Sequence, residues 1–249
     1  MYRFFVDPGQ IHPEEKRVVI TGSDVNHIRN VLRMKPGEEI SVSNGQDGRE
    51  YRCGILELTE DAIYCELRFI KEDNNELPVE VTLYQGLPKA DKMELIIQKC
   101  VELGVCRIVP VETKRAIVKL DPKKAVSRVQ RWQGIAEAAA KQSKRGIIPT
   151  VENVCSFAQA VKEASEMEVR LIPYELAEDM ENTRKLISAI EPGQKVAIFI
   201  GPEGGFDEKE IETALAAGIT PITLGKRILR TETAGMVALS WIGFALENS

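Results

Sequence analysis

The sequence has little histidine: among 249 residues only His12 and His27 occur, and both lie before residue 30. The rest of the chain therefore offers no imidazole for a Ser-His-Asp triad, a Cys-His pair or a histidine-bound metal. Clustered carboxylates with metal-ligand spacing are also missing, so we expect no metal site. Chemistry beyond residue 30 must use Arg, Glu, Lys or Tyr side chains and the positioning of reactants.

Cysteine is scarce, and long apolar runs are missing. The cysteines number five, and no two of them form a C-x-x-C pair. We therefore expect neither a disulfide framework nor a structural zinc site. This cysteine usage is typical of a protein of the reducing cytoplasm. No apolar stretch approaches the ~18 residues that span a bilayer. The opening stretch MYRFFVDPGQIHPEE lacks the apolar centre of a secretory signal. We expect a cytoplasmic protein without membrane contact.

Positive charge is not in excess overall, since the net charge is −5, but it is concentrated locally. Residues 114–145 contain ten Lys or Arg and only two acidic residues. Such a run is often a solvated helix face, but within an acidic chain it also indicates a polyanionic partner. Lys124, Arg128 and Arg131 recur at helical spacing, so they share one face of a helix.

The composition of the chain changes near residue 72. Before this point β-branched and aromatic residues are frequent, and one short helix is expected at 24–34. The polar segment 71–76, followed by Pro78, is typical of a linker. We expect a small barrel-like β domain over 1–72 and a second domain over 73–249. Strands of the first domain are expected at 17–21, 38–44, 49–58 and 62–70.

After the linker, apolar strands alternate with amphipathic helices. A helix over 91–104 is expected to be capped by Asp91 and Glu94, and a basic helix to begin at Asp121 and Pro122. This alternation predicts an α/β fold with a mostly parallel sheet that helices cover on both faces. Further strands are expected at 79–87, 106–111, 168–174, 195–200 and 221–224, and an apolar helix at 231–247.

A glycine-rich segment, GPEGGF at 201–206, follows an apolar strand. It matches neither the P-loop nor the dinucleotide-binding pattern. Asp207 and Glu210 form a capping box for the next helix, which places acid where a phosphate would otherwise dock. The segment therefore suits a neutral or cationic ligand. The alternative is that its glycines only permit a tight turn.

A second loop between strand and helix, LGKRILRTETA at 224–234, has the same arrangement. Because both loops follow strands, a parallel sheet would bring them together in the crevice at its carboxyl edge. Arg227 and Thr233 supply polar groups there. Arg230 and Glu232 also supply polar groups there. The alternative is that these two residues only form an ion pair at the start of the helix. Group transfer from an activated cationic cofactor fits a site without imidazole, because the leaving group departs unaided.

Both loop motifs, with QKCVELGV at 98–105, RWQGIAEAAAKQSKRGIIP at 131–149 and HIRNVLRMKPGEEI at 27–40, resemble the bacterial 16S ribosomal RNA uridine N3-methyltransferases, which belong to the SPOUT class. The resemblance covers nearly the whole chain. It implies a SPOUT-type parallel-sheet domain with a deep C-terminal trefoil knot, preceded by a PUA-like β-barrel that binds RNA. It also implies a homodimer that uses S-adenosylmethionine to methylate uridine N3 in small-subunit ribosomal RNA.

The resemblance further implies where the cofactor is held. The two loops enclose it, Tyr174 and Glu175 form a third wall, and Glu203 places negative charge near its sulfonium or a hydroxyl. The expected cofactor-binding residues are Ile200, Gly201, Glu203, Gly204, Gly205, Leu224, Gly225, Ile228, Leu229, Arg230, Thr233 and Ala234.

The catalytic roles are left unranked. Glu203 or Glu232 would accept the N3 proton, and Arg230 or Arg145 would stabilise charge that develops on the base. Contacts with ribosomal RNA or the small subunit are expected from His27, Arg29, Arg33, Lys124, Arg128, Arg131, Lys144 and Arg145.

Two other functions stay open. One is a SPOUT enzyme that acts on another RNA, such as transfer RNA. The other is a non-catalytic RNA-binding protein of ribosome assembly, against which the intact cofactor loops argue. The C-terminal helix is apolar on more than one side, which indicates a dimer interface, with core packing as the alternative.

Overall fold

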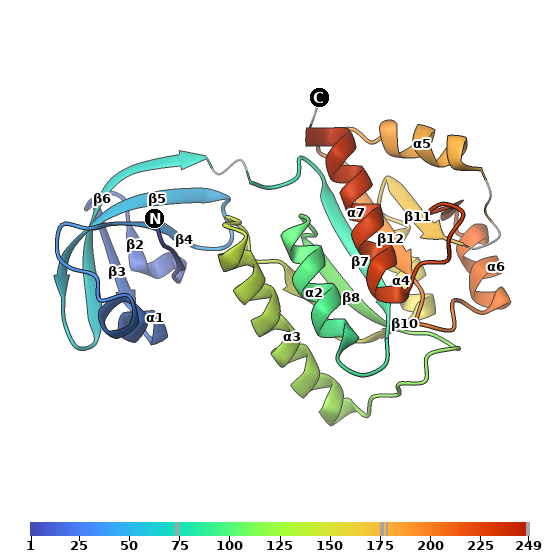
Figure 1. Ribbon diagram of the computed structural model, residues 1–249, viewed down its shortest axis with the longest axis horizontal. Helices are drawn as coiled ribbons and strands as arrows, with labels where there is room; N and C mark the ends of the chain where they lie inside the picture. The colour runs from blue at the N-terminus through green and yellow to red at the C-terminus, as the bar shows by residue number, and fades with distance from the viewer. Residues whose placement is uncertain (73–74, 175–176, 178, 248–249) are drawn as a thin grey trace. The chain divides into compact units, whose positions relative to one another are not determined.

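The computed structural model describes residues 1–72, 75–174, 177 and 179–247. The chain forms two compact units (Figure 1). The N-terminal unit comprises Met1–Glu76 and Ala140–Ile148, and the C-terminal unit comprises Leu77–Ala139 and Pro149–Ser249. The division into domains 1–72 and 73–249 stays a prediction; the compact units differ from it by including residues 140–148 in the N-terminal unit.

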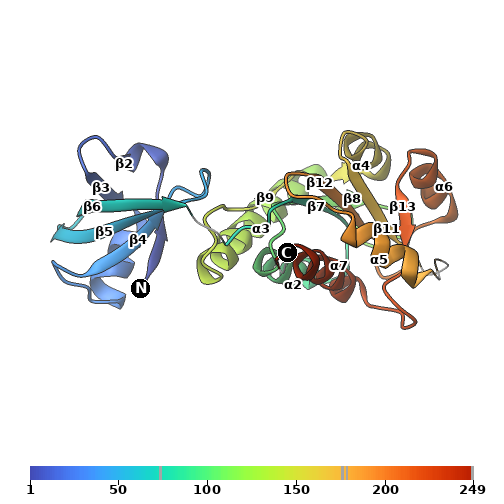
Figure 2. The same cartoon turned by 90° about the horizontal axis from the view of Figure 1, so that it is seen from above.

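The described residues of the N-terminal unit form a curled six-stranded sheet with the order β1-β4-β5-β6-β3-β2 (Figure 2). β1 and β4 pair in parallel, and the other neighbours pair antiparallel. The inward faces of the strands make the core, where Val18, Ile20, Ile40 and Ile63 are fully buried. The strands are β1 Arg3–Phe5, β2 Ile11–His12, β3 Arg17–Thr21, β4 Glu39–Ser43, β5 Arg49–Leu58 and β6 Ala62–Glu72.

The short helix expected in this unit is irregular. It begins as α1, Ser23–Asn26, and continues as a π-helical turn, η2, over His27–Val31. Ile28 is fully buried within this turn. Arg33 then adopts a left-handed φ of 54°, and the Met34 N–H donates to the Ile28 carbonyl at 3.0 Å. Such a closure ends a helix, so the helix lies where it was predicted but ends at Val31 rather than at Met34.

Glu50, on β5, is a buried charge at the centre of three cations. Its side chain is 4% exposed and lies 2.6 Å from Arg52 Nε, 2.8 Å from Lys71 Nζ and 3.5 Å from Arg3 Nη2. Burial alone would raise the pKa of Glu50, but Lys71, the Ser41 hydroxyl, Arg52 and Arg3 outweigh it and lower the pKa to about 2. The carboxylate therefore stays ionised and ties together three parts of the sheet.

Residues 140–148 complete the N-terminal unit from a distant part of the sequence. Arg145 is paired with Glu76, its side chain is 3% exposed, and the two are joined at 2.5 Å. The Ser43 hydroxyl donates to the Gly146 carbonyl at 2.8 Å, and this bond is buried. These buried polar contacts satisfy groups on both segments, so the unit depends on both.

The described strands of the C-terminal unit form a seven-stranded parallel sheet with the order β10-β8-β7-β12-β11-β13, and β9 pairs with β8. Helices α4 and α6 lie on one face, and α2, α5 and α7 on the other (Figure 2). The predicted α/β fold with a doubly covered sheet is confirmed. The strands are β7 Glu80–Gly86, β8 Arg107–Glu112, β9 Thr150–Val151, β10 Cys155–Ser156, β11 Val169–Pro173, β12 Lys195–Ile200 and β13 Thr220–Ile222.

The middle of this sheet explains the apolar run that precedes the glycine-rich loop. β12 lies between β7 and β11, and its residues Val196–Ile200 are all buried. A parallel strand covered on both faces is apolar throughout rather than alternating. Tyr84 of β7 stacks on Phe199 of β12, with ring centroids 4.5 Å apart. The strand therefore delivers the loop after Ile200 to the carboxyl edge of the sheet.

The predicted helix caps had mixed outcomes. Asp207 and Glu210 form the expected capping box, and the Asp121 carboxylate accepts from the Lys124 N–H at 3.0 Å. Asp91 makes no side-chain cap bond, and the Glu94 N–H donates to the Asp91 backbone carbonyl at 3.0 Å instead. The Glu94 side chain pairs with Arg131 at 2.8 Å, so the predicted capping box does not form. No described helix has the length and hydropathy to cross a membrane. The helices are α2 Lys92–Glu102, α3 Pro122–Gln142, α4 Phe157–Ala164, α5 Met180–Ser188, α6 Glu208–Ala216 and α7 Thr231–Glu247.

Candidate active site

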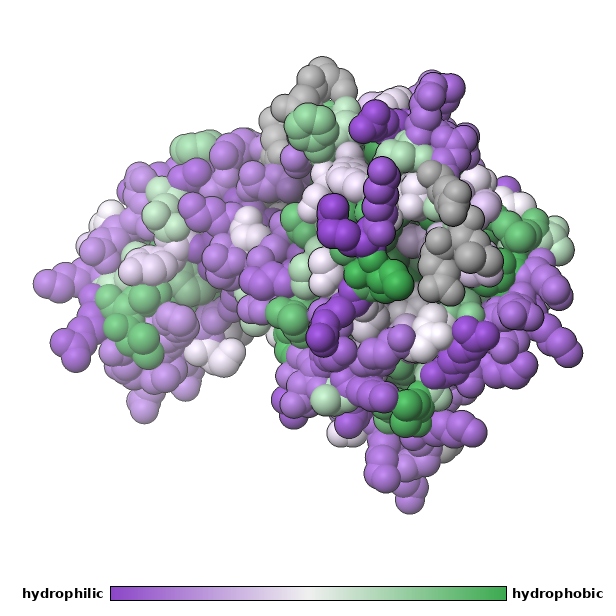
Figure 3. All heavy atoms as spheres, turned by 45° about the vertical axis from the view of Figure 1, so that its right-hand side comes forward, coloured by the Kyte–Doolittle hydropathy of each residue, from purple (hydrophilic) through white to green (hydrophobic). Residues whose placement is uncertain are grey.

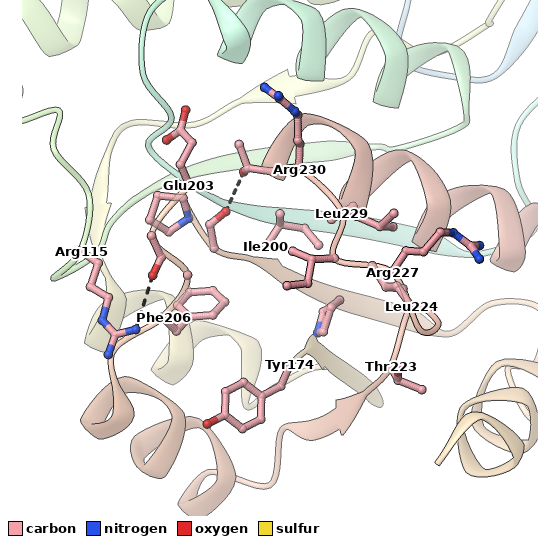
Figure 4. Close-up of a pocket in the computed structure, with 18 of the residues that line it drawn as sticks. Arg115, Tyr174, Ile200, Glu203, Phe206, Thr223, Leu224, Arg227, Leu229 and Arg230 are labelled. Carbon is pink, nitrogen blue, oxygen red and sulfur yellow. Dashed lines mark hydrogen bonds between the residues drawn. The ribbon is translucent and has the colours of Figure 1, made fainter. Parts of the chain in front are cut away.

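A cavity of about 650 Å³ opens at the carboxyl edge of the parallel sheet in the C-terminal unit (Figure 4). Three strand ends supply its walls: Pro173 ends β11 and Tyr174 follows it, Ile200 ends β12 and residues 201–206 follow it, and residues 223–231 follow β13. The two loops singled out from the sequence therefore face one cavity, as a parallel sheet requires.

Most of the expected cofactor-binding residues line this cavity. The exception is Thr233, which lies in the first turn of α7, where its N–H donates to the Arg230 carbonyl at 2.9 Å. Tyr174 forms part of the wall, whereas Glu175 lies outside the described residues. The residues found on the lining are Ile200, Gly201, Glu203, Gly204, Gly205, Leu224, Gly225, Ile228, Leu229, Arg230 and Ala234.

Several lining residues were missed by the sequence analysis. Lys92 comes from the start of α2, and Arg115 comes from the loop between β8 and α3. Arg115 donates to the Gly204 carbonyl at 3.4 Å and lies 3.8 Å from Asp207, so it braces the glycine-rich loop (Figure 4). No local signal marks either residue, since each reaches the cavity only through the fold. Phe206 could have been found, because it ends the quoted glycine motif.

A chain of hydrogen bonds joins two strand ends and the start of α7 beneath the cavity. The Thr231 hydroxyl donates to the Gly201 carbonyl at 2.6 Å and accepts from Gln85 Nε2 at 2.9 Å. Gln85 also donates to the Gly86 carbonyl at 3.0 Å. Gln85 is fully buried and Thr231 is buried. These bonds fix the end of β7, the glycine-rich loop and the start of α7 relative to one another.

Thr231→Val is therefore expected to lower the free energy of unfolding by about 1–3 kcal/mol, because the Gly201 carbonyl loses its Thr231 donor and the buried Gln85 amide loses one of its two acceptors. Chemical denaturation monitored by circular dichroism measures this change. Thr213→Val is the matched control, since the Thr213 hydroxyl makes its bond to the Lys209 carbonyl on the exposed side of α6. Equal losses in the two variants would show that the buried bonds add nothing.

The two predicted catalytic carboxylates are both engaged. Glu203 accepts from the Lys89 N–H at 3.1 Å and lies 3.0 Å from Lys92 Nζ, and Glu232 lies 3.2 Å from the same Nζ. Burial acts to raise the pKa of each carboxyl, but backbone N–H groups and Lys92 outweigh it and lower both pKa values. A general base works best with a pKa near the working pH. The surroundings therefore weaken both groups as proton acceptors.

The two predicted charge-stabilising arginines differ. Arg230 lines the cavity, is exposed at its mouth, and extends to the same side as Glu203 (Figure 4). Arg145 belongs to the N-terminal unit and is buried against Glu76. Its expected roles in catalysis and RNA contact are not compatible with this burial, because exposing the guanidinium would break its ion pair with the Glu76 carboxylate.

The other expected RNA-binding cations reach the solvent. On α3, Lys124 and Arg131 have side chains that are 77% and 67% exposed, and Arg128 is exposed between them. In the N-terminal unit His27, Arg33 and Lys144 are exposed, and Arg29 is half-buried. The His27 ring also meets Phe4 edge-on, with centroids 6.3 Å apart. The visible face of the C-terminal unit carries both hydrophilic and hydrophobic residues (Figure 3).

The residues that line the cavity fit S-adenosylmethionine in their chemistry. A methyl group added at Gly201 would lie 3.2 Å from Gly205 and 3.3 Å from Phe206, so only glycine lets the loop fold back this closely to form the cavity wall. Ile200, Leu224 and Leu229 give apolar walls. A carboxylate at the mouth suits a cation, whereas the acidic cap at Asp207 disfavours phosphate.

Comparison with known proteins agrees with this chemistry. The model of an RNA methyltransferase domain matches residues 75–243, and that of an RNA methyltransferase PUA domain matches residues 20–68. The chain belongs to this RNA methyltransferase family. It is 38% identical over 251 residues to "Ribosomal RNA small subunit methyltransferase E" of Bacillus subtilis (strain 168), covering 99% of this chain and 98% of that protein.

Solved structures of the family share the fold. The crystal structure of ribosomal RNA small subunit methyltransferase E from Neisseria gonorrhoeae bound to S-adenosyl methionine aligns with a TM-score of 0.82 at 32% identity, covering 98% of this chain and 97% of that chain. The PUA-type N-terminal module and the SPOUT-type parallel sheet are thus confirmed. The trefoil knot and the homodimer stay predictions.

Proposed function

We propose that this RNA methyltransferase transfers a methyl group from S-adenosylmethionine to N3 of one uridine in the 16S ribosomal RNA of the small subunit, in the cytoplasm. The observation that carries the proposal is the cavity between the two strand-to-helix loops, which combines apolar walls, bare glycine backbone and a carboxylate. The comparisons support the proposal because the chain resembles RNA methyltransferases over nearly its full length.

The loop residues would hold the cofactor. Ile200, Leu224 and Leu229 would pack against its adenosine, and the backbone around Gly201 and Gly205 would hydrogen-bond to its polar edges. Glu203 would face the positive part of the ligand. When bound, the cofactor supplies a methyl group on a sulfonium, which any correctly placed nucleophile can accept.

The chain's own groups would activate the uracil. N3 must lose a proton before or during attack, and negative charge then spreads over the neighbouring carbonyl oxygens. Arg230 at the cavity mouth would stabilise that charge. Glu203 or Glu232 would take the proton, directly or through a water, although their lowered pKa values favour a larger contribution from Arg230.

Methylation assays with purified 16S ribosomal RNA and with small subunits test this function. After incubation with S-adenosylmethionine, nucleoside mass spectrometry is expected to find N3-methyluridine. A methyl group on ribose or another base would overturn the N3 assignment. Methylation confined to transfer RNA, or no methylation of any RNA pool, would favour one of the two alternative functions.

The exposed cations of α3 would bind the RNA backbone, together with His27, Arg29, Arg33 and Lys144. Changing Lys124, Arg128 and Arg131 together to Ala is expected to weaken RNA binding and to reduce its dependence on salt, because fewer counterions are released. Cofactor affinity should not change.

Filter-binding titrations over a range of salt concentrations measure this effect. An Ala triple at Arg184, Lys185 and Lys209, exposed cations on α5 and α6, changes the net charge equally and is the control. If RNA binding falls equally in both triple-alanine variants, the loss comes from the change in net charge and not from a specific contact of α3 with RNA.

We also propose that the protein is a homodimer that uses α7 in its interface. Phe244 on this helix is 76% exposed, so α7 presents an apolar side chain to which a partner copy could bind. Light scattering at micromolar concentration tests the proposal, and a monomer would remove it.

A further inference from the structure

Lys92 occupies a place in the cavity that its own stretch of sequence does not suggest. Its ammonium group lies 3.0 Å from a Glu203 oxygen and 3.2 Å from a Glu232 oxygen. Glu203 belongs to the glycine-rich loop, Glu232 to the first turn of α7, and Lys92 to the first turn of α2. These three residues, named here the Lys92 clasp, join three separate parts of the cavity wall.

The clasp is more enclosed than an ordinary surface ion pair. The side chains of Lys92, Glu203 and Glu232 are 28%, 26% and 16% exposed. A second contact fixes Glu203, since both of its oxygens accept from the Lys89 N–H, at 3.1 and 3.3 Å. Exposed pairs contribute little because two long side chains must be ordered for one contact. Here one ordered lysine serves two carboxylates that the backbone already places.

We propose that Lys92 is a positioning residue, which ties the glycine-rich loop to α7 and fixes the Glu203 carboxylate at the mouth of the cofactor cavity. The inference rests on the proposed use of S-adenosylmethionine. It gives the two carboxylates a different role from that of a base: Glu203 meets the positive ligand, and Glu232 anchors the lysine from the other side.

The charged groups around the clasp determine how the pKa values of Glu203 and Glu232 change when Lys92 is replaced. Lys92 from α2 and Arg230 before α7 are the cations that act on Glu232, and Lys92 with the Lys89 N–H acts on Glu203. Arg115 approaches from the loop after β8, where it contacts the Gly204 carbonyl. Without the ammonium group, two partly buried carboxylates face each other, and burial and like charge both raise their pKa values.

Calorimetric titration with S-adenosylmethionine of wild type, Lys92→Met and Lys92→Arg tests the proposal. At about pH 7, Lys92→Met should bind about 10- to 30-fold more weakly, and Lys92→Arg should recover most of the affinity. Lys99→Met is the matched control, because Lys99 lies on the same helix and pairs with Glu102, away from the clasp. It should bind as wild type does.

A second titration at about pH 5.5 separates positioning of a charge from general loosening of the loops. Wild-type affinity should be the same at both pH values, since its Glu203 stays ionised. In Lys92→Met the affinity should fall further at the lower pH, as a carboxylate with a raised pKa takes up a proton.

Two results would overturn the inference: wild-type affinity in Lys92→Met, or a loss that is equal at both pH values and not restored by arginine. Failure of the proposed function itself looks different, because the wild-type protein would then bind no S-adenosylmethionine at either pH.

Discussion

Replacing Gly86 with alanine is expected to weaken S-adenosylmethionine binding by about 100-fold or more, because it displaces a wall of the cavity without touching the ligand. Gly86 is the last residue of β7. A methyl group there would lie 2.7 Å from Pro202 Cδ, 2.8 Å from the Pro202 nitrogen and 3.2 Å from the Gly201 carbonyl carbon. Backbone atoms cannot turn aside as a flexible side chain can, so the glycine-rich loop must move.

Calorimetric titration measures the affinity, and circular dichroism establishes that the variant is folded. Gly134→Ala is the control: Gly134 lies in α3 with open space around it, and alanine there should stabilise the helix by about 0.5–1 kcal/mol. A folded Gly86→Ala protein with wild-type affinity would show that the loop can shift without cost to the cavity, and would contradict the role given to this close approach.

Glu50→Gln is expected to lower the free energy of unfolding at neutral pH by about 1.5–3 kcal/mol, because it removes the buried negative charge that Lys71, Arg52 and Arg3 share. Urea unfolding of the full chain measures the loss. Glu72→Gln is the control, since Glu72 is 77% exposed and its contact with Arg49 is 3.7 Å long; a change below about 0.5 kcal/mol is expected there.

The Glu50 effect should depend on pH in a defined direction. The pKa of the folded state, about 2, lies below the ordinary value of 4.5. The carboxylate therefore stabilises the fold fully above about pH 4.5, and this contribution is lost as the pH falls toward about 2. Wild type and Glu50→Gln should approach each other in stability over that range. A gap that stays constant down to about pH 2 would mean that the charge is not the cause.

Local patterns in the sequence predicted most of the secondary structure. The final helix was expected at 231–247 and spans Thr231–Glu247, and the strand expected at 49–58 spans Arg49–Leu58. The Asp207 capping box is likewise a local arrangement. These features depend on neighbours within a few residues, so the sequence alone is sufficient to locate them.

The rest of the site depends on contacts between distant residues. Lys92 contacts Glu203 and Glu232, and Gln85 contacts Thr231, yet no spacing rule links these pairs. The importance of Gly86 appears only when β7 and the loop after β12 lie side by side. What could be predicted was the edge of the sheet where ligands gather; which side chains brace that edge could not.

Arg145 shows how a charge pattern misleads. It ends the basic stretch and was grouped with the RNA-binding cations, but it pairs with Glu76, 69 residues earlier in the chain. A buried ion pair and an exposed RNA contact look alike in a count of charges. The capping box predicted for Asp91 is a milder case. The box requires the Glu94 side chain, which pairs with Arg131 instead.

The split N-terminal unit has a consequence for synthesis on the ribosome. The sheet is complete by Glu72, but Glu76 meets Arg145, and Ser43 meets Gly146, only after residue 148 has been made. At ~5–20 residues per second, the 72 residues that separate Glu76 from Ile148 take roughly 4–14 s to add. During that interval the Glu76 carboxylate and the Ser43 hydroxyl lack the partners that they have in the folded unit. The first segment to emerge therefore completes its structure only when the middle of the chain has followed it.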